Sequence, residues 1–173
     1  MSPPRKAILF ILALALLHLY IRHLPPYQPL NHVTVIHCYD GDTCRVKTIG
    51  GFTLNVRLAA IDAPERAYRY KPAQPFSDEA REFLEGEIKN KTVRMSQSDL
   101  DRYNRPVVFL YKDGIEMNKR MLINGLAHAY SGRTKFDPRP YRLLESMARR
   151  KSLGLWSQER VISPSTYRKK TRK

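Results

Sequence analysis

Three acidic residues in this sequence follow stretches that are typical of β-strands. Asp42 closes the turn-like letters YDGD, and Asp62 and Glu65 lie at the end of the stretch NVRLAAIDAPE. The first Asp and the Gly of YDGD are ordinary turn residues, because Asp bonds to nearby backbone and Gly adopts positive φ freely. Asp42 either belongs to a plain hairpin turn or presents a carboxylate from a rigid element. With Asp62 and Glu65 it would offer the oxygen ligands that a hard divalent cation such as Ca²⁺ prefers.

Two arginines also lie on, or at the start of, predicted strands. Arg57 belongs to the strand that leads to Asp62, and Arg105 opens a strand after a turn in which Asn104 can adopt left-handed backbone. A guanidinium fixed at a strand end can bind a phosphate with two hydrogen bonds, although either arginine alone could be a solvated surface residue. Arg57 and Asp62 are an odd number of residues apart, so they share a site only if the chain bends between them, which we expect at Ala59-Ala60.

These residue types suit the hydrolysis of a phosphodiester. The substrate is anionic, and its transition state gathers further negative charge on the equatorial oxygens. A divalent cation and two guanidinium groups would neutralise that charge and orient the phosphorus. Glu65, which follows a rigid Pro, could take the proton of an attacking water.

Hydrophobic patterning predicts the elements that must position these groups. β-branched and alternating stretches predict five strands, and a spacing of three and four residues predicts three helices. A helix between the third and fourth strands is typical of the OB-fold, a small closed Greek-key barrel, so we expect an α+β, mainly β domain. The expected strands are 33–39, 43–49, 52–61, 92–97 and 105–114. The expected helices lie within 77–90, with Ser77 or Asp78 as N-cap, within 118–127, ending near Gly125, and within 138–156, ending near Gly154.

The two ends of the chain differ from this domain in composition. Residues 7–21 carry no formal charge, a length between that of a signal-peptide core and that of a membrane-spanning helix. We therefore expect residues 1–24 to be a membrane anchor or a signal peptide, which places the rest of the chain outside the cytoplasm, either anchored to the membrane or secreted. Residues 25–32 would be a Pro-rich linker, residues 33–158 the barrel domain, and residues 159–173 a basic tail, of which we expect residues 166–173 to be disordered.

Charge and cysteine content narrow the function further. The chain has 31 Lys+Arg against 16 Asp+Glu, a net charge of +15, which favours a polyanionic partner such as nucleic acid or an anionic membrane.

Cys38 and Cys44 flank the turn that contains Asp42. An exported location would permit a disulfide between them, and otherwise they would be two small buried residues.

Several short motifs together resemble one known family. DGDT, VRLAAIDAPE, a predicted helix, DRYNRP and GLWS follow one another from about Val33 to Ser157. In this order and spacing they resemble the staphylococcal nuclease (thermonuclease) family. By this resemblance Asp42 and Asp62 would be Ca²⁺ ligands together with the backbone carbonyl of Ala63, and Glu65 would be the general base or would orient the attacking water.

The same resemblance assigns the phosphate and nucleotide contacts. Arg57 and Arg105 would hold the scissile phosphate. Arg102 and Tyr103 would bind near the terminal phosphate of the nucleotide, and Tyr130 would contact a base or a sugar. The predicted protein is a monomeric, Ca²⁺-dependent nuclease that cuts DNA and RNA, single-stranded or frayed duplex, with little sequence preference and leaves 3′-phosphate ends. The alternative is a non-catalytic nucleic-acid-binding OB-fold tethered to a membrane.

Overall fold

The computed structural model describes residue 14 and residues 31–171. The predicted N-terminal segment 1–24, apart from Leu14, and most of the predicted linker 25–32 lie outside the described residues. Within the part of the chain that is described, no helix is long and apolar enough to cross a membrane.

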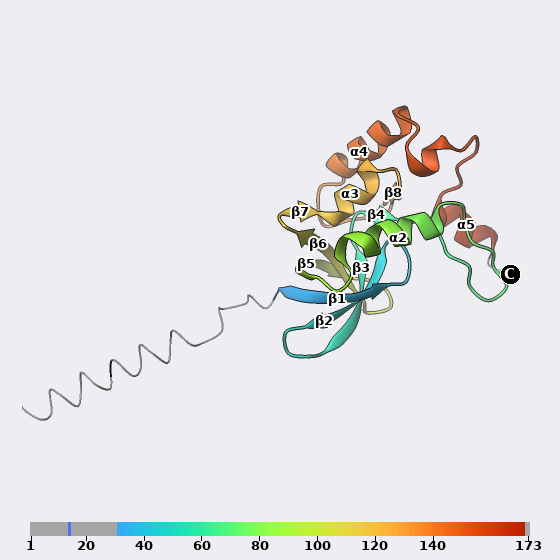
Figure 1. The fold of residues 1–173 in the computed structure, drawn as a ribbon. Helices are drawn as coiled ribbons and strands as arrows, with labels where there is room; N and C mark the ends of the chain where they lie inside the picture. Colours follow the sequence, from blue (N-terminus) through green and yellow to red (C-terminus); the bar gives the residue numbers. More distant parts are fainter. Residues whose placement is uncertain (1–13, 15–30, 172–173) are drawn as a thin grey trace, which may run out of the picture.

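Five strands form a closed barrel, which confirms the predicted OB-fold (Figure 1). The strand order is β3-β2-β1-β5-β6, and a parallel pairing of β3 with β6 closes the barrel. The other neighbouring pairs are antiparallel. These strands are β1 His32–Cys38, β2 Thr43–Thr48, β3 Thr53–Leu58, β5 Thr92–Leu100 and β6 Pro106–Lys112.

Alternating apolar residues fill the barrel interior. In β1, Val33 and Val35 are buried, whereas the residues between and beside them are partly exposed. Val108 and Leu110 of β6 are buried in the same way. Such period-two burial fixes the register, because a slip by one residue would turn these side chains to solvent. The strand ends that carry the polar residues are therefore held in place by the core.

Four α-helices are described, one more than the sequence predicts. Helices α2, α3 and α4 lie together above the strands in Figure 1, and α5 lies to one side. The helices are α2 Ser77–Ile88, α3 Met117–Ile123, α4 Arg139–Arg150 and α5 Pro164–Lys170, with a 3₁₀ turn η1 at Gly154–Ser157. Three short strands complete the fold: β4 Ile61–Asp62, β7 Ile115–Glu116 and β8 His128–Ala129.

The helix boundaries correct two predictions. The residue before α2 is Phe76 in the left-handed conformation, and no side chain caps the helix, although Ser77 and Asp78 are good capping residues. The last predicted helix, expected to end near Gly154, ends at Arg150. Ser152 (φ 50°) leaves the helical conformation, and Gly154 (φ 53°) packs against the backbone of Gly125, where an added Cβ would overlap with backbone atoms.

The predicted bend between Arg57 and Asp62 is present. Strand β3 ends at Leu58, Ala60 has a φ of 65°, and β4 begins at Ile61. The fully buried Asn118 supports this bend, because its amide donates to the carbonyls of Ala59 (2.8 Å) and Val108 (3.0 Å). The sequence predicts Asn118 only as a helix start, since its partners are remote in the chain.

The prediction that residues 166–173 are disordered is wrong for residues 166–170, because they belong to helix α5. Pro164 is buried at the start of the helix, where its missing N–H costs no hydrogen bond. The hydroxyl of Ser163 caps the helix by accepting from the N–H of Thr166 (3.3 Å). The sequence analysis does not predict this helix, because the neighbouring run of Lys and Arg indicates a solvated segment.

Candidate active site

A single arginine joins the two buried acids predicted as metal ligands. Arg57 donates to Asp42 Oδ1 at 2.8 Å and to Asp62 Oδ1 at 2.7 Å. Asp42 and Asp62 are 2% and 5% exposed, so neither carboxylate is well solvated. Although burial opposes its charge, the two aspartates raise the pKa of Arg57. The bend at Ala59-Ala60 brings these three residues together from the turn before β2, from β3 and from β4.

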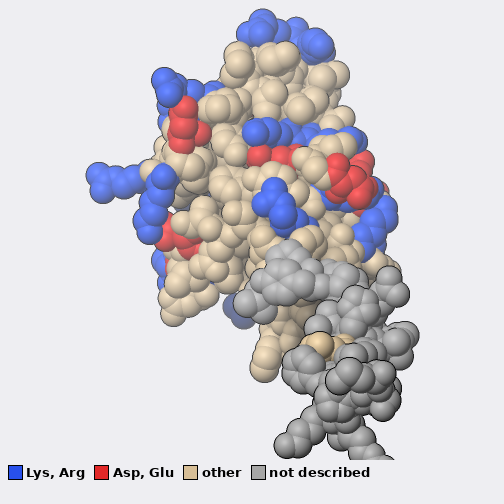
Figure 2. Space-filling model, turned by 90° about the vertical axis from the view of Figure 1, so that its left-hand side faces the viewer, with Lys and Arg blue, Asp and Glu red and all other residues tan. Residues whose placement is uncertain are grey.

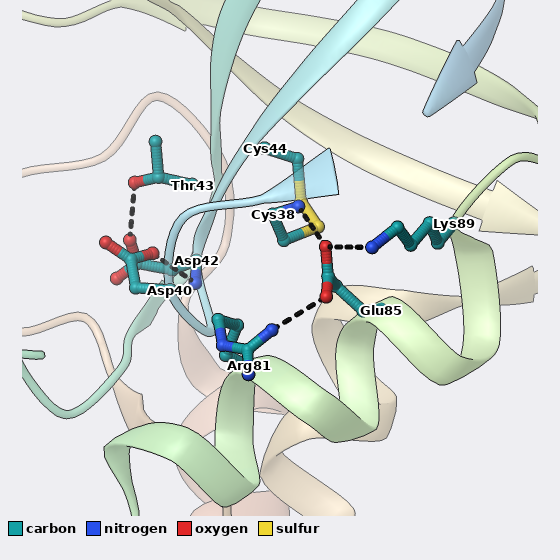
Figure 3. Close-up of a disulfide and its surroundings, with 8 residues drawn as sticks. All are labelled: Cys38, Asp40, Asp42, Thr43, Cys44, Arg81, Glu85 and Lys89. Carbon is teal, nitrogen blue, oxygen red and sulfur yellow. Dashed lines mark hydrogen bonds and ion pairs between the residues drawn. A yellow bond between two sulfur atoms is a disulfide. The ribbon is translucent and has the colours of Figure 1, made fainter. Parts of the chain in front are cut away.

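A disulfide closes the turn that presents Asp42. Cys38 and Cys44 face each other directly in the pairing of β1 with β2, and they are bonded. Figure 3 shows that Asp40, Asp42 and Thr43 lie on one side of this bridge and Glu85 of α2 on the other. Glu85 accepts from the backbone N–H of Cys38 at 3.0 Å and so attaches the turn to the helix.

Asp40 takes part in this site, although its position in the sequence predicts only a turn residue. Its Oδ1 accepts from the N–H of Asp42 at 2.9 Å, which is the expected turn bond. Burial and the neighbouring Asp42 carboxylate raise the pKa of Asp40 to about 7. In the sequence, the only local sign of a raised pKa at Asp40 is the second acid of DGD, Asp42. The size of the effect depends on how deeply the fold buries Asp40.

Glu65 is placed by a reciprocal pair of hydrogen bonds with Gln74. The N–H of Glu65 donates to the side-chain oxygen of Gln74 at 2.9 Å, and the N–H of Gln74 donates to the carbonyl of Glu65 at 2.8 Å. Gln74 is buried, whereas the Glu65 side chain is 35% exposed. The backbone of Glu65 is thus fixed while its carboxylate remains within reach of a bound molecule.

Arg105 is oriented by the turn that precedes β6. Asp101 accepts hydrogen bonds from the backbone N–H groups of Tyr103 (2.8 Å) and Arg105 (2.9 Å) and from Arg105 Nε (2.8 Å). Burial alone would raise the pKa of Asp101, but these bonds lower it. Asn104 has a φ of 58°, the left-handed conformation that the sequence predicts.

An open cleft of about 660 Å³ brings six of the predicted site residues to one surface, whereas Asp42, Asp62 and Ala63 are not among the residues that line it. Four cationic residues missed by the sequence analysis also line it: Arg133, Lys135, Arg168 and Lys169. Tyr103 and Tyr130 are 65% and 39% exposed, so their rings are available for stacking. The predicted site residues that line the cleft are Arg57, Glu65, Arg102, Tyr103, Arg105 and Tyr130.

The structure brings one more predicted group to this site. Ala63 is buried, and its backbone N–H donates to Asp42 Oδ2 at 2.8 Å.

Within the described residues, no three His, Cys, Asp or Glu side chains are grouped ready to hold a metal ion. Asp42 and Asp62 instead share Arg57. Carboxylate and carbonyl oxygens are nevertheless the donors that suit Ca²⁺, so the chemistry of the set fits such a cation.

Of the residues that the sequence analysis misses, Arg168 of α5 contacts the predicted acids directly. Its guanidinium donates to Asp62 Oδ1 (3.1 Å), to Asp62 Oδ2 (3.0 Å) and to Glu65 Oε1 (2.5 Å). No local signal indicates this contact, because more than a hundred residues separate Arg168 from these acids along the chain.

Basic side chains outnumber acidic ones in the lining of the cleft. The chain as a whole has 31 Lys+Arg against 16 Asp+Glu. On the face that Figure 2 shows, Lys and Arg side chains are widely spread, and the Asp and Glu side chains form a few small groups beside them. A basic surface attracts polyanions and accelerates their association.

Comparison with known proteins connects this site to a family. A family model described as "Staphylococcal nuclease homologue" matches residues 55–158. The chain is 37% identical over 125 residues to "Probable endonuclease LCL3" of Komagataella phaffii, an alignment that covers 68% of this chain and 55% of that protein. It is 33% identical over 139 residues to "Uncharacterized endonuclease" of Haemophilus influenzae, covering 80% and 74%. It thus spans about half the length of the Komagataella relative.

Proposed function

Because this chain belongs to the staphylococcal nuclease family, we propose that it is an endonuclease that hydrolyses phosphodiester bonds of DNA and RNA. The observation that carries this proposal is the arrangement of Arg57, which binds both buried aspartates, next to Glu65 and Arg105 in one open cleft. A barrel that only binds nucleic acid would not need two buried acids at its binding surface, because they repel the phosphates.

The residues of the cleft have distinct roles in the proposed reaction. Arg57 and Arg105 bind the non-bridging oxygens of the scissile phosphate and stabilise the charge that develops there. Glu65 accepts a proton from the attacking water, or orients it, at the carboxylate that Gln74 positions through the backbone. By family resemblance, the bond to the 5′ oxygen breaks and a 3′-phosphate remains.

The proposed cofactor is Ca²⁺, held by the carboxylates of Asp42 and Asp62 and by the backbone carbonyl of Ala63. When bound, such a cation would neutralise phosphate charge and act as a Lewis acid. The turn closed by the Cys38–Cys44 bridge holds Asp42 in position for this role. The donor chemistry and the family support this assignment.

The substrate is proposed to be bound with little sequence preference. The exposed rings of Tyr103 and Tyr130 offer stacking surfaces, which every base can use. Arg102, like Arg133 and Lys135, supplies a charge for the backbone phosphates on either side of the cut. A single strand or the frayed end of a duplex suits such a cleft, because its bases can leave the stack.

We further propose that the protein is a monomer that works outside the cytoplasm, anchored by residues 1–24 or secreted after their removal. The disulfide supports this location, since such bonds persist in oxidising compartments. Protease protection of the C-terminus in intact cells, and its loss when the outer barrier is opened, would test the location.

Cleavage assays on the purified full-length chain in mild detergent test the proposed activity. Single-stranded DNA, duplex DNA and RNA are incubated with Ca²⁺ or with a chelator. We expect Ca²⁺-dependent cleavage of all three, with Glu65→Gln slower by about 10² to 10⁴-fold. Glu79→Gln, which removes an exposed acid from α2, is the matched control and should cleave at the wild-type rate. Tight binding without cleavage would instead favour the non-catalytic alternative.

A further inference from the structure

The C-terminal helix enters the site with a positive charge. Arg168 binds both carboxylate oxygens of Asp62 and one oxygen of Glu65. The Asp62 side chain is 7% exposed and that of Arg168 is 35% exposed, so the ion pair is partly shielded from water. Apart from Arg57, Arg168 is the only cationic side chain among the described residues that forms an ion pair with Asp62.

Specific contacts fasten this helix to the loop that follows Glu65. Gln74, which positions the Glu65 backbone, also donates from its side chain to the carbonyl of Ile162 at 3.0 Å. The hydroxyl of Tyr167 donates to the carbonyl of Pro72. Figure 1 shows α5 beside this loop, away from the other helices. The contact of Arg168 with the acids is therefore part of a defined docked arrangement.

A docked Arg168 and a bound cation exclude each other. A divalent cation needs carboxylate oxygens of Asp62, and the guanidinium of Arg168 already occupies both of them. Because Asp62 Oδ1 also accepts from Arg57, a cation at this carboxylate would be a third positive group, and the two guanidinium groups would repel it in this partly buried place. The cation can bind fully only after Arg168 has moved away.

We propose that α5 is an autoinhibitory latch, in which Arg168 occupies the place of the divalent cation on Asp62 and Glu65 until the cation displaces it. This inference rests on the proposed function in that it assumes a cation-binding site at these acids. The latch lowers the apparent affinity for the cation, because only the undocked fraction of the protein can bind it. It also holds Oε1 of Glu65 in an ion pair, which competes with the interaction of that oxygen with an attacking water.

Release of the latch would turn an inhibitor into a substrate contact. Helix α5 also carries the exposed residues Lys169 and Lys170, and Lys169 lines the cleft. Once Arg168 has left the acids, these three positive charges face an anionic strand in the cleft. Nucleic acid and the cation should then favour the same undocked state, so each should strengthen the binding of the other.

The test measures cation binding and helix docking separately from catalysis. The full-length chain, Arg168→Gln and the control Lys170→Gln are titrated with Ca²⁺ by calorimetry in the absence of nucleic acid. Loss of the two ion pairs should lower the dissociation constant of Arg168→Gln about tenfold, or about 1.4 kcal/mol. Lys170→Gln removes the same charge without touching the acids, so its constant should change less than about twofold.

Hydrogen exchange of residues 164–170, followed by mass spectrometry, provides the second readout. In the wild type, Ca²⁺ should accelerate exchange of these amides, whereas in Arg168→Gln they should exchange rapidly without Ca²⁺. The wild-type measurement needs no variant, so it decides the question even if a substitution disturbs folding.

Three results would overturn the inference. They are exchange in α5 that Ca²⁺ does not change, an Arg168→Gln affinity equal to or weaker than that of the control, and absence of Ca²⁺ binding by both wild type and Arg168→Gln. The latch and the nuclease activity can fail independently. Cleavage with unaltered Ca²⁺ affinity in Arg168→Gln would refute only the latch, and tighter Ca²⁺ binding without cleavage would refute only the nuclease.

Discussion

The two arginines proposed to bind phosphate should differ in their importance for folding. Arg57→Gln leaves two buried aspartates without their shared partner, and loss of one member of a buried ion pair costs about 3–5 kcal/mol. Asp42 keeps the N–H of Ala63, and Asp62 keeps Arg168, so part of this cost is avoided. We therefore expect the free energy of unfolding to fall by about 2 kcal/mol.

Arg105→Gln provides the matched comparison. Its partner Asp101 retains two backbone N–H donors, and an ion pair of this exposure contributes less than about 1 kcal/mol. Urea unfolding in the presence of a chelator would measure both variants, while cleavage should fall by at least about a hundredfold in each. If Arg105→Gln is destabilised as much as Arg57→Gln, or if neither is destabilised, Arg57 does not hold the acids together as argued.

Three further predictions concern the bridge, an ion pair and the substrate. Reduction of the disulfide, which closes a loop of seven residues, should cost about 2 kcal/mol and lower the melting temperature by about 6 °C; coincident melting curves with and without reductant would contradict this. Burial opposes ionisation of Glu145, but hydrogen bonds from His128 and Arg149 lower its pKa below the ordinary value of 4.5. The ionised Glu145 therefore contributes to stability above pH 4.5, and this contribution is lost as the pH falls further. The stability of Glu145→Gln should therefore fall less than that of wild type between about pH 5 and pH 3 in urea unfolding, and equal losses would argue against the ion pair. Finally, if four or five cationic side chains of the cleft contact phosphates, the affinity of Glu65→Gln for single-stranded DNA should fall with salt with a logarithmic slope of about −3, and a slope near zero would exclude the cleft as the binding surface.

Local sequence patterns predict much of the architecture. Alternating apolar residues predict the strands of the barrel, since burial of one face requires a period of two. The acids and arginines are recognisable because they stand at strand ends, in short motifs with turn residues beside them. Asn104 is a feature that the local sequence predicts correctly. Its left-handed backbone depends only on its own side chain and its neighbours in the chain.

Other features depend on contacts between distant parts of the chain. The shared ion pairs of Arg57 require the bend at Ala60, and that bend is supported by Asn118 from a helix that begins far along the sequence. The raised pKa of Asp40 likewise depends first on its burial by the surrounding structure, with a further contribution from Asp42 of the same turn.

The sequence by itself determined the barrel, the acids and the arginines that lie at its strand ends, because each follows from a pattern a few residues long. Only the tertiary structure decided that Arg168 meets Asp62 and Glu65. The basic segment reads as solvated because a run of like charges repels itself. That reading changes when Gln74 and Pro72 bind the returning chain and bring one of those charges to two acids that need a partner.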